Sequence, residues 1–85
     1  MIGTLYVDGS ESCNDLEGAI PNCIYEELEI VSNDTIDGLR RCSEERIFKF
    51  PILEMDGERY ATRYRILDIL QSLAVKGGHF PPHFE

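Results

Sequence analysis

Apolar and polar residues follow two periods along this chain, one typical of strands and one typical of helices. Their order predicts strand, helix, strand, helix, strand, strand and helix. The predicted ranges are residues 4–7, 13–20, 24–31 and 35–46, then a hairpin around Asp56-Gly57 and a helix from Thr62 onward. A strand–helix–strand start implies a parallel pair, and a hairpin adds antiparallel strands. We therefore expect an α/β fold with a mixed four-stranded sheet flanked by helices.

The clearest signals lie between Pro51 and Leu73. Pro51 opens an apolar strand, where its missing backbone N–H requires an edge, a bulge or a cis peptide bond. The pair Asp56-Gly57 suits a two-residue turn that needs positive φ. The helix that follows is expected to bury one face, formed by Ile66, Ile69, Leu70 and Leu73.

Capping residues and apolar spacing define the two earlier helices. The first has two competing N-caps, Ser10 and Ser12, and ends before Pro21, because proline disfavours a helical conformation in the residue before it. The second has an apolar face that we assign to Ile36, Leu39 and Cys42. Gly38 lies inside this second helix, where glycine costs about 1 kcal/mol relative to alanine.

Length and charge narrow the functional classes. The chain has 85 residues, of which 42% are hydrophobic and 28% are charged, as in one small globular domain rather than a disordered chain. We expect residues 1–76 to form that domain and residues 77–85 to form a C-terminal tail. A net charge of -8 argues against nucleic-acid binding, because phosphate contacts need clustered Lys and Arg.

Membrane and export signals are the next features to consider. No apolar run reaches the roughly 18 residues that a membrane-spanning helix needs. Met1 leads almost directly into a strand, without the basic and apolar segments of a signal peptide, so we expect a cytoplasmic protein. The acidic surface and the lack of any feature that requires self-association favour a monomer.

The segment from Pro51 to Ile66 resembles glutaredoxins and related small thioredoxin-fold proteins. Glutaredoxins carry a proline, an Asp-Gly pair five and six residues later, and then an apolar helix position; these are here Pro51, Asp56-Gly57 and Ile66. Leu5-Tyr6 is also similar to the start of their first strand, so the resemblance spans roughly residues 3–75. It implies a thioredoxin-like β-α-β-α-β-β-α fold, with Pro51 in a cis peptide bond and its loop facing the start of the first helix.

The resemblance places a reactive centre at the start of the first helix, where glutaredoxins have Cys-x-x-Cys. If Ser10 and Cys13 occupy the two cysteine positions, the attacking thiol is missing and only the resolving position is kept. If Ser12 is instead the N-cap, Cys13 becomes the first helical residue, and the loop before it is longer than in the family. Cys13 is the one redox candidate in either register. Cys23 has no assigned chemistry, and Cys42 is expected to be a small core residue.

Two functions follow from this comparison. The resemblance implies a glutaredoxin-like thiol protein, in which the Cys13 thiolate attacks a mixed disulfide and a second thiol resolves it, with Pro51 as a backbone platform. Its partner would be a protein thiol or disulfide. The alternative is a redox-inactive thioredoxin-fold module that binds a protein partner or a small anionic ligand. The binding residues would then be Pro51, Ile52, Arg63 and Tyr64.

Local charge and composition bear on both functions. The acidic residues Glu11, Asp15 and Glu17 surround Cys13, so we expect a thiol pKa no lower than that of free cysteine.

Glutathione is the small molecule that glutaredoxins bind. The Gly-Gly pair and the Asp that bind it in glutaredoxins are replaced by residues 60–64, where Tyr64 stands at the Asp position and only Arg63 can hold a carboxylate. We therefore expect no cofactor. We also expect no metal site, because prolines between His79 and His83 exclude the helix that would bring them together.

Overall fold

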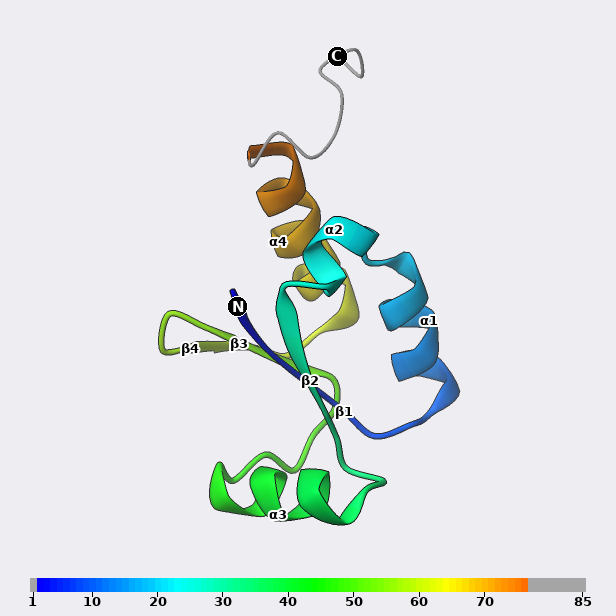
Figure 1. The fold of residues 1–85 in the computed structure, drawn as a ribbon, viewed down its shortest axis with the longest axis vertical. Helices are drawn as coiled ribbons and strands as arrows, with labels where there is room; N and C mark the ends of the chain where they lie inside the picture. The colour runs from blue at the N-terminus through cyan, green and yellow to red at the C-terminus, as the bar shows by residue number, and fades with distance from the viewer. Residues whose placement is uncertain (1, 77–85) are drawn as a thin grey trace.

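The computed structural model describes residues 2–76, which form four strands and four helices, one helix more than predicted (Figure 1). The strands are β1 (Gly3–Val7), β2 (Leu28–Ser32), β3 (Ile52–Met55) and β4 (Glu58–Tyr60). The helices are α1 (Glu11–Ala19), α2 (Asn22–Tyr25), α3 (Ile36–Glu44) and α4 (Arg63–Lys76). The predicted tail, residues 77–85, lies outside the described residues together with His79 and His83.

The four strands form one mixed sheet in the order β2-β1-β3-β4. β1 pairs in parallel with β2, whereas β3 is antiparallel to both of its neighbours, β1 and β4. This confirms the predicted α/β class, with a parallel pair joined to an antiparallel hairpin. No helix within residues 2–76 combines the length and the apolar character needed to cross a membrane.

Alternation along the central strand β1 sends its side chains into two separate cores. Leu5 and Val7 contribute to the larger core, which they form with residues of α1, α2 and α4. Tyr6 points to the opposite face of the sheet, where it packs with Val31 of β2 and Cys42 of α3. Figure 1 shows α3 lying apart from the other three helices, which gather on the other side of the sheet. The sheet is therefore covered on both faces.

The hairpin and the last helix form as predicted. Asp56 (φ 52°) and Gly57 (φ 79°) make a two-residue turn between β3 and β4, with positive φ at both positions. In α4, Ile66 and Leu70 are fully buried, and the other two residues of the predicted apolar face pack against the same core.

Helix α2 replaces the first part of the strand predicted from Ile24, so that prediction is wrong. The carbonyl oxygen of Pro21 accepts the N–H groups of Ile24 and Tyr25, each at 2.9 Å. Ile24 is buried in the larger core, and the Tyr25 hydroxyl donates to Glu17 of α1 at 2.8 Å. These tertiary contacts outweigh the alternating pattern of the segment, and the strand begins only at β2.

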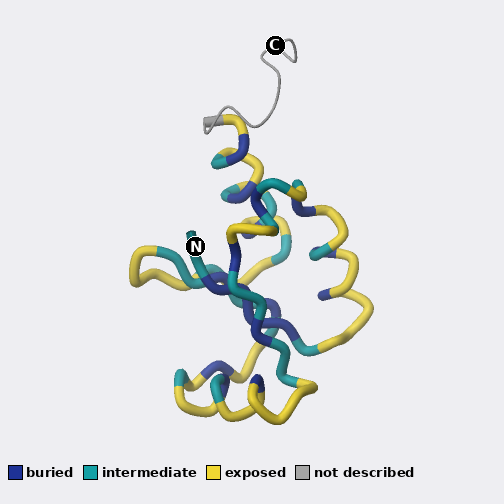
Figure 2. The backbone as a smooth tube through the Cα atoms, viewed as in Figure 1, coloured by how far each residue is buried: buried dark blue, intermediate teal, exposed yellow. Residues whose placement is uncertain are grey.

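The predicted apolar face of α3 is wrong for two of its three residues. Ile36 and Leu39 are 81% and 55% exposed, whereas Cys42 is buried as predicted, together with Gly38. Figure 2 shows α3 as mostly exposed, with few buried positions. The cause is a close approach of two backbones, because a Cβ atom at Gly38 would collide with the carbonyl oxygen of Ser32. Glycine therefore sets the rotation of α3 about its axis, and the larger apolar side chains point to solvent.

Gly38→Ala is expected to destabilise the protein, although alanine is the better helix former. The added methyl group would push α3 away from the sheet, and such overpacking costs about 1–3 kcal/mol, against about 1 kcal/mol gained in helix propensity. Gly18→Ala in α1 is the matched control, because no atom outside its chain neighbours and its own helix backbone lies within 4 Å of the added Cβ, and it should stabilise the fold. Urea denaturation measures both free energies of unfolding. A Gly38→Ala protein as stable as the Gly18→Ala protein would contradict the close approach.

Candidate functional site

The strand register places the predicted site residues around one end of the sheet. Tyr6 of β1 lies opposite Ile52 of β3, so the end of β1, which leads into α1, adjoins Pro51. β4 pairs with β3 through Tyr60 and Leu53, so it finishes at this same end before α4 begins. We call this the α1 end of the sheet. The segments that meet there carry Ser10, Cys13, Pro51, Ile52, Arg63 and Tyr64.

These residues do not all face one another. Cys13 packs in the core beneath α1, whereas Ile52 packs with Tyr6 on the face covered by α3, so the sheet separates their side chains. The Phe50–Pro51 peptide bond is cis, as the resemblance implied, and Pro51 is buried. The site therefore comprises the start of α1, the start of β3 and the start of α4, with Ile52 turned to the opposite face.

Hydrogen bonds from two side chains hold the start of α1. Ser10 is the N-cap, and its Oγ accepts the N–H of Cys13 at 3.3 Å. Asp8 Oδ1 in turn accepts the N–H of Ser10 at 3.0 Å. Hydrogen bonds from the hydroxyl and the backbone of Ser10 lower the pKa of Asp8. Of the two registers that the sequence left open, the structure therefore adopts the one capped by Ser10, and Cys13 is the third residue of α1.

The Cys13 thiol is buried and poorly suited to act as a nucleophile. Its residue is only 1% exposed. Burial raises the pKa of the Cys13 thiol and the charge of Asp8 raises it further, while hydrogen bonds with the Asp8 backbone and the Ser10 hydroxyl oppose the rise. The raised pKa agrees with the expected direction, although the carboxylate that contributes is Asp8 rather than the acidic residues of α1. At neutral pH the thiol is therefore protonated.

The other two cysteines lie away from this position. Cys42 is buried against Tyr6 on the α3 face, as expected for a small core residue, and burial raises its pKa. Cys23 lies half-buried in α2, and all three thiols are free. Within residues 2–76, no group of three or more His, Cys, Asp and Glu side chains is arranged to hold a metal ion.

Two arginine–tyrosine pairs lie around the start of α4. The Cζ atom of Arg63 is 5.4 Å from the centre of the Tyr64 ring, and that of Arg65 is 5.7 Å from the centre of the Tyr60 ring. The Tyr60 hydroxyl donates to Glu58 at 3.0 Å, whereas Tyr64 is 76% exposed. This part of the site presents an exposed aromatic ring beside a cation, a combination that is enriched in protein interfaces.

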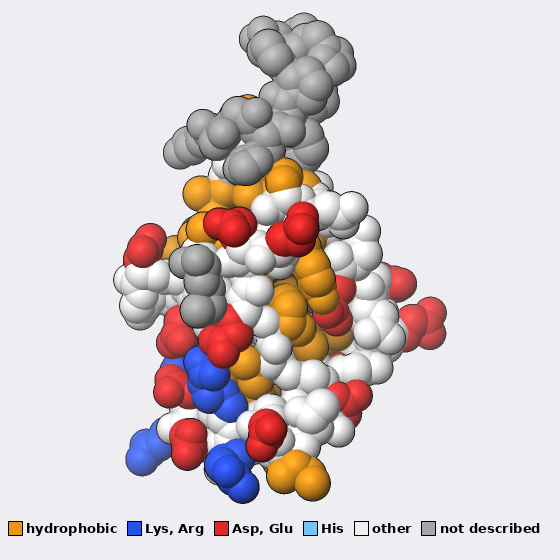
Figure 3. Space-filling model, viewed as in Figure 1, with side chains coloured by type: hydrophobic (Ala, Val, Ile, Leu, Met, Phe, Trp, Pro, Cys, Tyr) orange, Lys and Arg blue, Asp and Glu red, His pale blue; other side chains and the backbone are white. Residues whose placement is uncertain are grey.

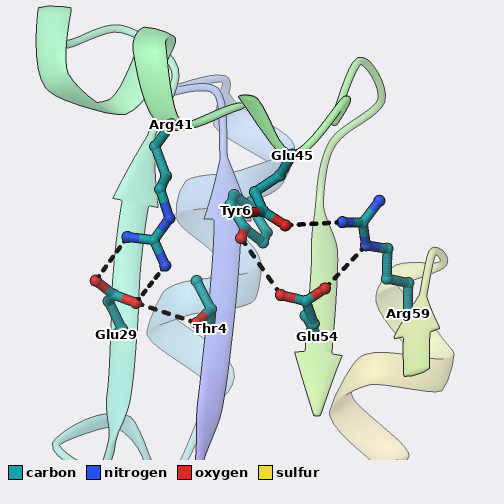
Figure 4. Close-up of polar contacts among 7 residues, drawn as sticks. All are labelled: Thr4, Tyr6, Glu29, Arg41, Glu45, Glu54 and Arg59. Atoms are coloured by element: carbon teal, nitrogen blue, oxygen red, sulfur yellow. Dashed lines mark hydrogen bonds and ion pairs between the residues drawn. The ribbon is translucent and has the colours of Figure 1, made fainter. Parts of the chain in front are cut away.

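A polar cluster that the sequence did not predict holds α3 against the sheet (Figure 4). Arg41 of α3 donates two hydrogen bonds to Glu29 of β2, at 3.0 and 2.9 Å. Thr4 donates to the same carboxylate at 3.1 Å. The bonds from Arg41 are the main reason that the pKa of Glu29 is lowered. Strand periodicity can assign Glu29 to a face of the sheet, but it does not identify the helical residue that covers that face.

The second half of this cluster is centred on Arg59 of β4. Its Nε donates to Glu54 of β3 at 3.0 Å, and its Nη2 donates to Glu45 at 3.1 Å. The hydroxyl of the fully buried Tyr6 donates to Glu54 at 3.5 Å. Burial, followed by the charge of Glu54, raises the pKa of Tyr6. The alternation of side chains on β1 and β3 is the sequence signal for this contact, because it places Tyr6 and Glu54 on the same face of the sheet.

No protein-family model, no curated protein and no solved structure matches this chain. The α1 end of the sheet is where the predicted site residues meet. The two features that matter most there are the buried, protonated Cys13 thiol and the exposed ring of Tyr64.

Arg41→Met is expected to weaken the fold at neutral pH and to have less effect in acid. The pKa of Glu29 is lowered from its usual 4.5, so the pairing stabilises the folded state above pH 4.5 and is lost as pH falls through the folded-state pKa. Both side chains are more than one third exposed, so the effect should not exceed about 1 kcal/mol. Urea midpoints at pH 7 and pH 3 in low salt measure it, with Arg40→Met as the exposed control. An equal loss at both pH values would rule out this electrostatic contribution.

Cys13 is expected to react with iodoacetamide more slowly than Cys23 in the folded protein. Cys13 is buried and its pKa is raised, whereas Cys23 is half-buried. Mass spectrometry of peptides after alkylation across a pH series gives both rates, and unfolding in urea should make them similar. A faster reaction at Cys13, with an apparent pKa below about 6.5, would instead indicate an activated thiol.

Proposed function

We propose that this protein is a thioredoxin-like binding module that does not exchange disulfides and that binds a protein partner at the α1 end of its sheet. The order of elements supports the fold assignment. A parallel β1–β2 pair, an antiparallel hairpin that follows Pro51, and helices on both faces form the arrangement that the resemblance to glutaredoxins implies. The short helix α2 is an addition to that order.

The burial of Cys13 is the observation that carries the proposal. Disulfide exchange requires a thiolate that can approach a disulfide sulfur, so it depends on both pKa and access. Cys13 is 1% exposed and its pKa is raised, so it lacks both. Ser10, which stands three residues earlier, uses its hydroxyl to cap α1. A serine hydroxyl stays protonated at neutral pH and cannot replace a thiolate.

The start of α4 supports the binding role. Tyr64 is exposed and Arg63 lies against its ring, and neither residue belongs to the core. Aromatic and arginine side chains supply much of the binding energy in protein interfaces. Arg63 is also the group that would receive the carboxylate of a small anionic ligand such as glutathione. A protein partner fits the exposed Tyr64 ring better, because this ring offers apolar contact area as well as charge.

A thiol reaction at Cys13 is the competing function. Its support is positional, because Cys13 lies in the first turn of α1 at the same end of the sheet as Pro51. Free backbone N–H groups at a helix start favour a thiolate, although burial and Asp8 act against it here. Reaction would require an opening of the α1 start that exposes the sulfur.

Reduction of a glutathione mixed disulfide separates the two functions. We expect no turnover above background by the wild-type protein, because Cys13 is buried and protonated. Cys13→Ala should therefore match the wild type, and Cys23→Ala serves as the control for removal of a thiol. Turnover by the wild type and by Cys23→Ala, together with its loss in Cys13→Ala, would establish the thiol reaction and refute the binding-only function.

A further inference from the structure

A groove on the α3 face of the sheet is lined by apolar and cationic side chains that are not part of the binding site proposed at the α1 end. It has a volume of about 300 Å³ and lies between the loop that follows α3 and the strands β3 and β4. The lining residues are Arg46, Ile47, Phe48, Lys49, Ile52 and Arg59. The groove therefore combines three apolar side chains with three cationic ones.

Phe48 is the apolar residue of this groove that the core does not use. It is 76% exposed, whereas Ile47 before it is buried with Tyr6, and Phe50 after it packs against both cores. Aromatic residues and arginine are enriched in surfaces that bind proteins. The ring of Phe48 is thus available to a partner.

Arg46 occupies a backbone position that glycine would fill more favourably. The end of α3 forms a Schellman motif, in which Arg46 N–H donates to Ser43 at 3.2 Å and Ile47 N–H donates to Cys42 at 2.8 Å. The φ angle of Arg46 is 58°, in the left-handed region that disfavours residues with a Cβ atom. An arginine here weakens the fold, which points to a role for its side chain.

The cationic groups of the groove differ in how far they are already paired. Arg59 is hydrogen-bonded to Glu45 and Glu54, which fix its side chain at one side of the groove (Figure 4). Arg46 and Lys49 are exposed, and neither forms an ion pair with any residue of the described range 2–76. The chain has 8 Lys and Arg residues against 16 Asp and Glu. A groove lined by three cations therefore differs from the mostly acidic remainder of the chain. Figure 3 shows acidic groups spread over the visible face and basic groups gathered toward α3.

We propose that this groove binds an acidic segment of a protein partner. One large apolar side chain of that segment packs against Phe48 and Ile52, and its carboxylates pair with Arg46 and Lys49. This groove is separate from the α1 end of the sheet, so the inference goes beyond the proposed function and does not depend on it. A groove of this volume, at the lower end of the about 300–1,000 Å³ of ligand pockets, suits a short segment. Nucleic acid fits poorly, because a net charge of -8 repels phosphates.

Fluorescence anisotropy with the full chain tests this inference. The probe is a short fluorescein-labelled peptide in which Asp and Glu residues flank a central Leu-Phe pair. One comparison peptide replaces Leu-Phe with Ser-Ser, and a second replaces the acidic residues with Lys. The acidic peptide with Leu-Phe should bind most tightly, and added salt should weaken its binding.

Substitutions in the groove should weaken this binding. We expect Phe48→Ala to raise the Kd of the acidic apolar peptide about tenfold, and Lys49→Ala to raise it severalfold. Both side chains are exposed, so neither substitution should unfold the protein. Arg40→Ala removes an exposed cation of α3 outside the groove and should leave the Kd unchanged.

Arg46→Gly separates binding from stability. Glycine relieves the left-handed position, so the urea midpoint should rise, while loss of the guanidinium should raise the Kd of the acidic apolar peptide severalfold. A purely structural Arg46 would change the midpoint and leave the Kd unaltered.

Several outcomes would overturn the inference. The first two are no binding of the acidic apolar peptide and equal binding of all three peptides. The third is an unchanged Kd of that peptide in all three variants, Phe48→Ala, Lys49→Ala and Arg46→Gly. The fourth is tighter binding of poly(U) RNA than of any peptide. None of them bears on disulfide reduction, so the proposed function would stand as a separate result. Conversely, turnover through Cys13 would refute the binding-only function without changing the peptide affinities.

Discussion

The structure depends on the burial of β1 on both faces. Leu5 and Tyr6 are fully buried on opposite sides of this strand, and its two edges pair with β2 and β3. Its backbone groups are thus satisfied within the sheet while both faces are apolar enough to exclude water. The chain leaves β1 through Asp8, so the position of β1 determines where α1 begins. The same register brings Pro51 to this end of the sheet.

The two faces of the sheet are stabilised by different chemistry. The face under α1, α2 and α4 is apolar, whereas α3 approaches the opposite face through Gly38 and Cys42, which bury little side-chain surface. Around that contact, Arg41 and Arg59 bind carboxylates that project from the strands. Exposed ion pairs of this kind contribute about 0–1 kcal/mol each. Their role is to orient α3 and the loop after it, and that loop forms one side of the cationic groove.

The side chains that can contact a partner lie on the surface of this protein, whereas its candidate redox thiol is buried. The first turn of α1 places the Cys13 thiol in the core, where burial keeps it protonated. Tyr64 and Phe48, by contrast, are large aromatic residues that the fold leaves exposed next to cations. In an acidic chain such positions attract carboxylates while the rest of the surface repels them. Both proposals follow from this contrast between a shielded thiol and exposed rings.

Local signals in the sequence determined the order of elements apart from the short helix α2. The Asp56-Gly57 turn and the spacing of Ile66 and Leu70 in α4 depend on neighbouring residues alone, and they form as predicted. The segments around Ser10, Cys13 and Pro51 could also be assigned to one end of the sheet, because strand order and the resemblance already imply that arrangement.

Tertiary contacts decided which faces of the helices are buried and which distant side chains meet. The carbonyl oxygen of Ser32 requires glycine at position 38, and this close approach turns Leu39 to solvent against the apolar pattern of α3. Ile24 becomes helical because it packs into a core built by other segments. The grouping of Arg46 with Arg59 brings together residues that are far apart in sequence. Periodicity records which positions are apolar, whereas burial depends on which surfaces meet, and that is a property of the whole fold.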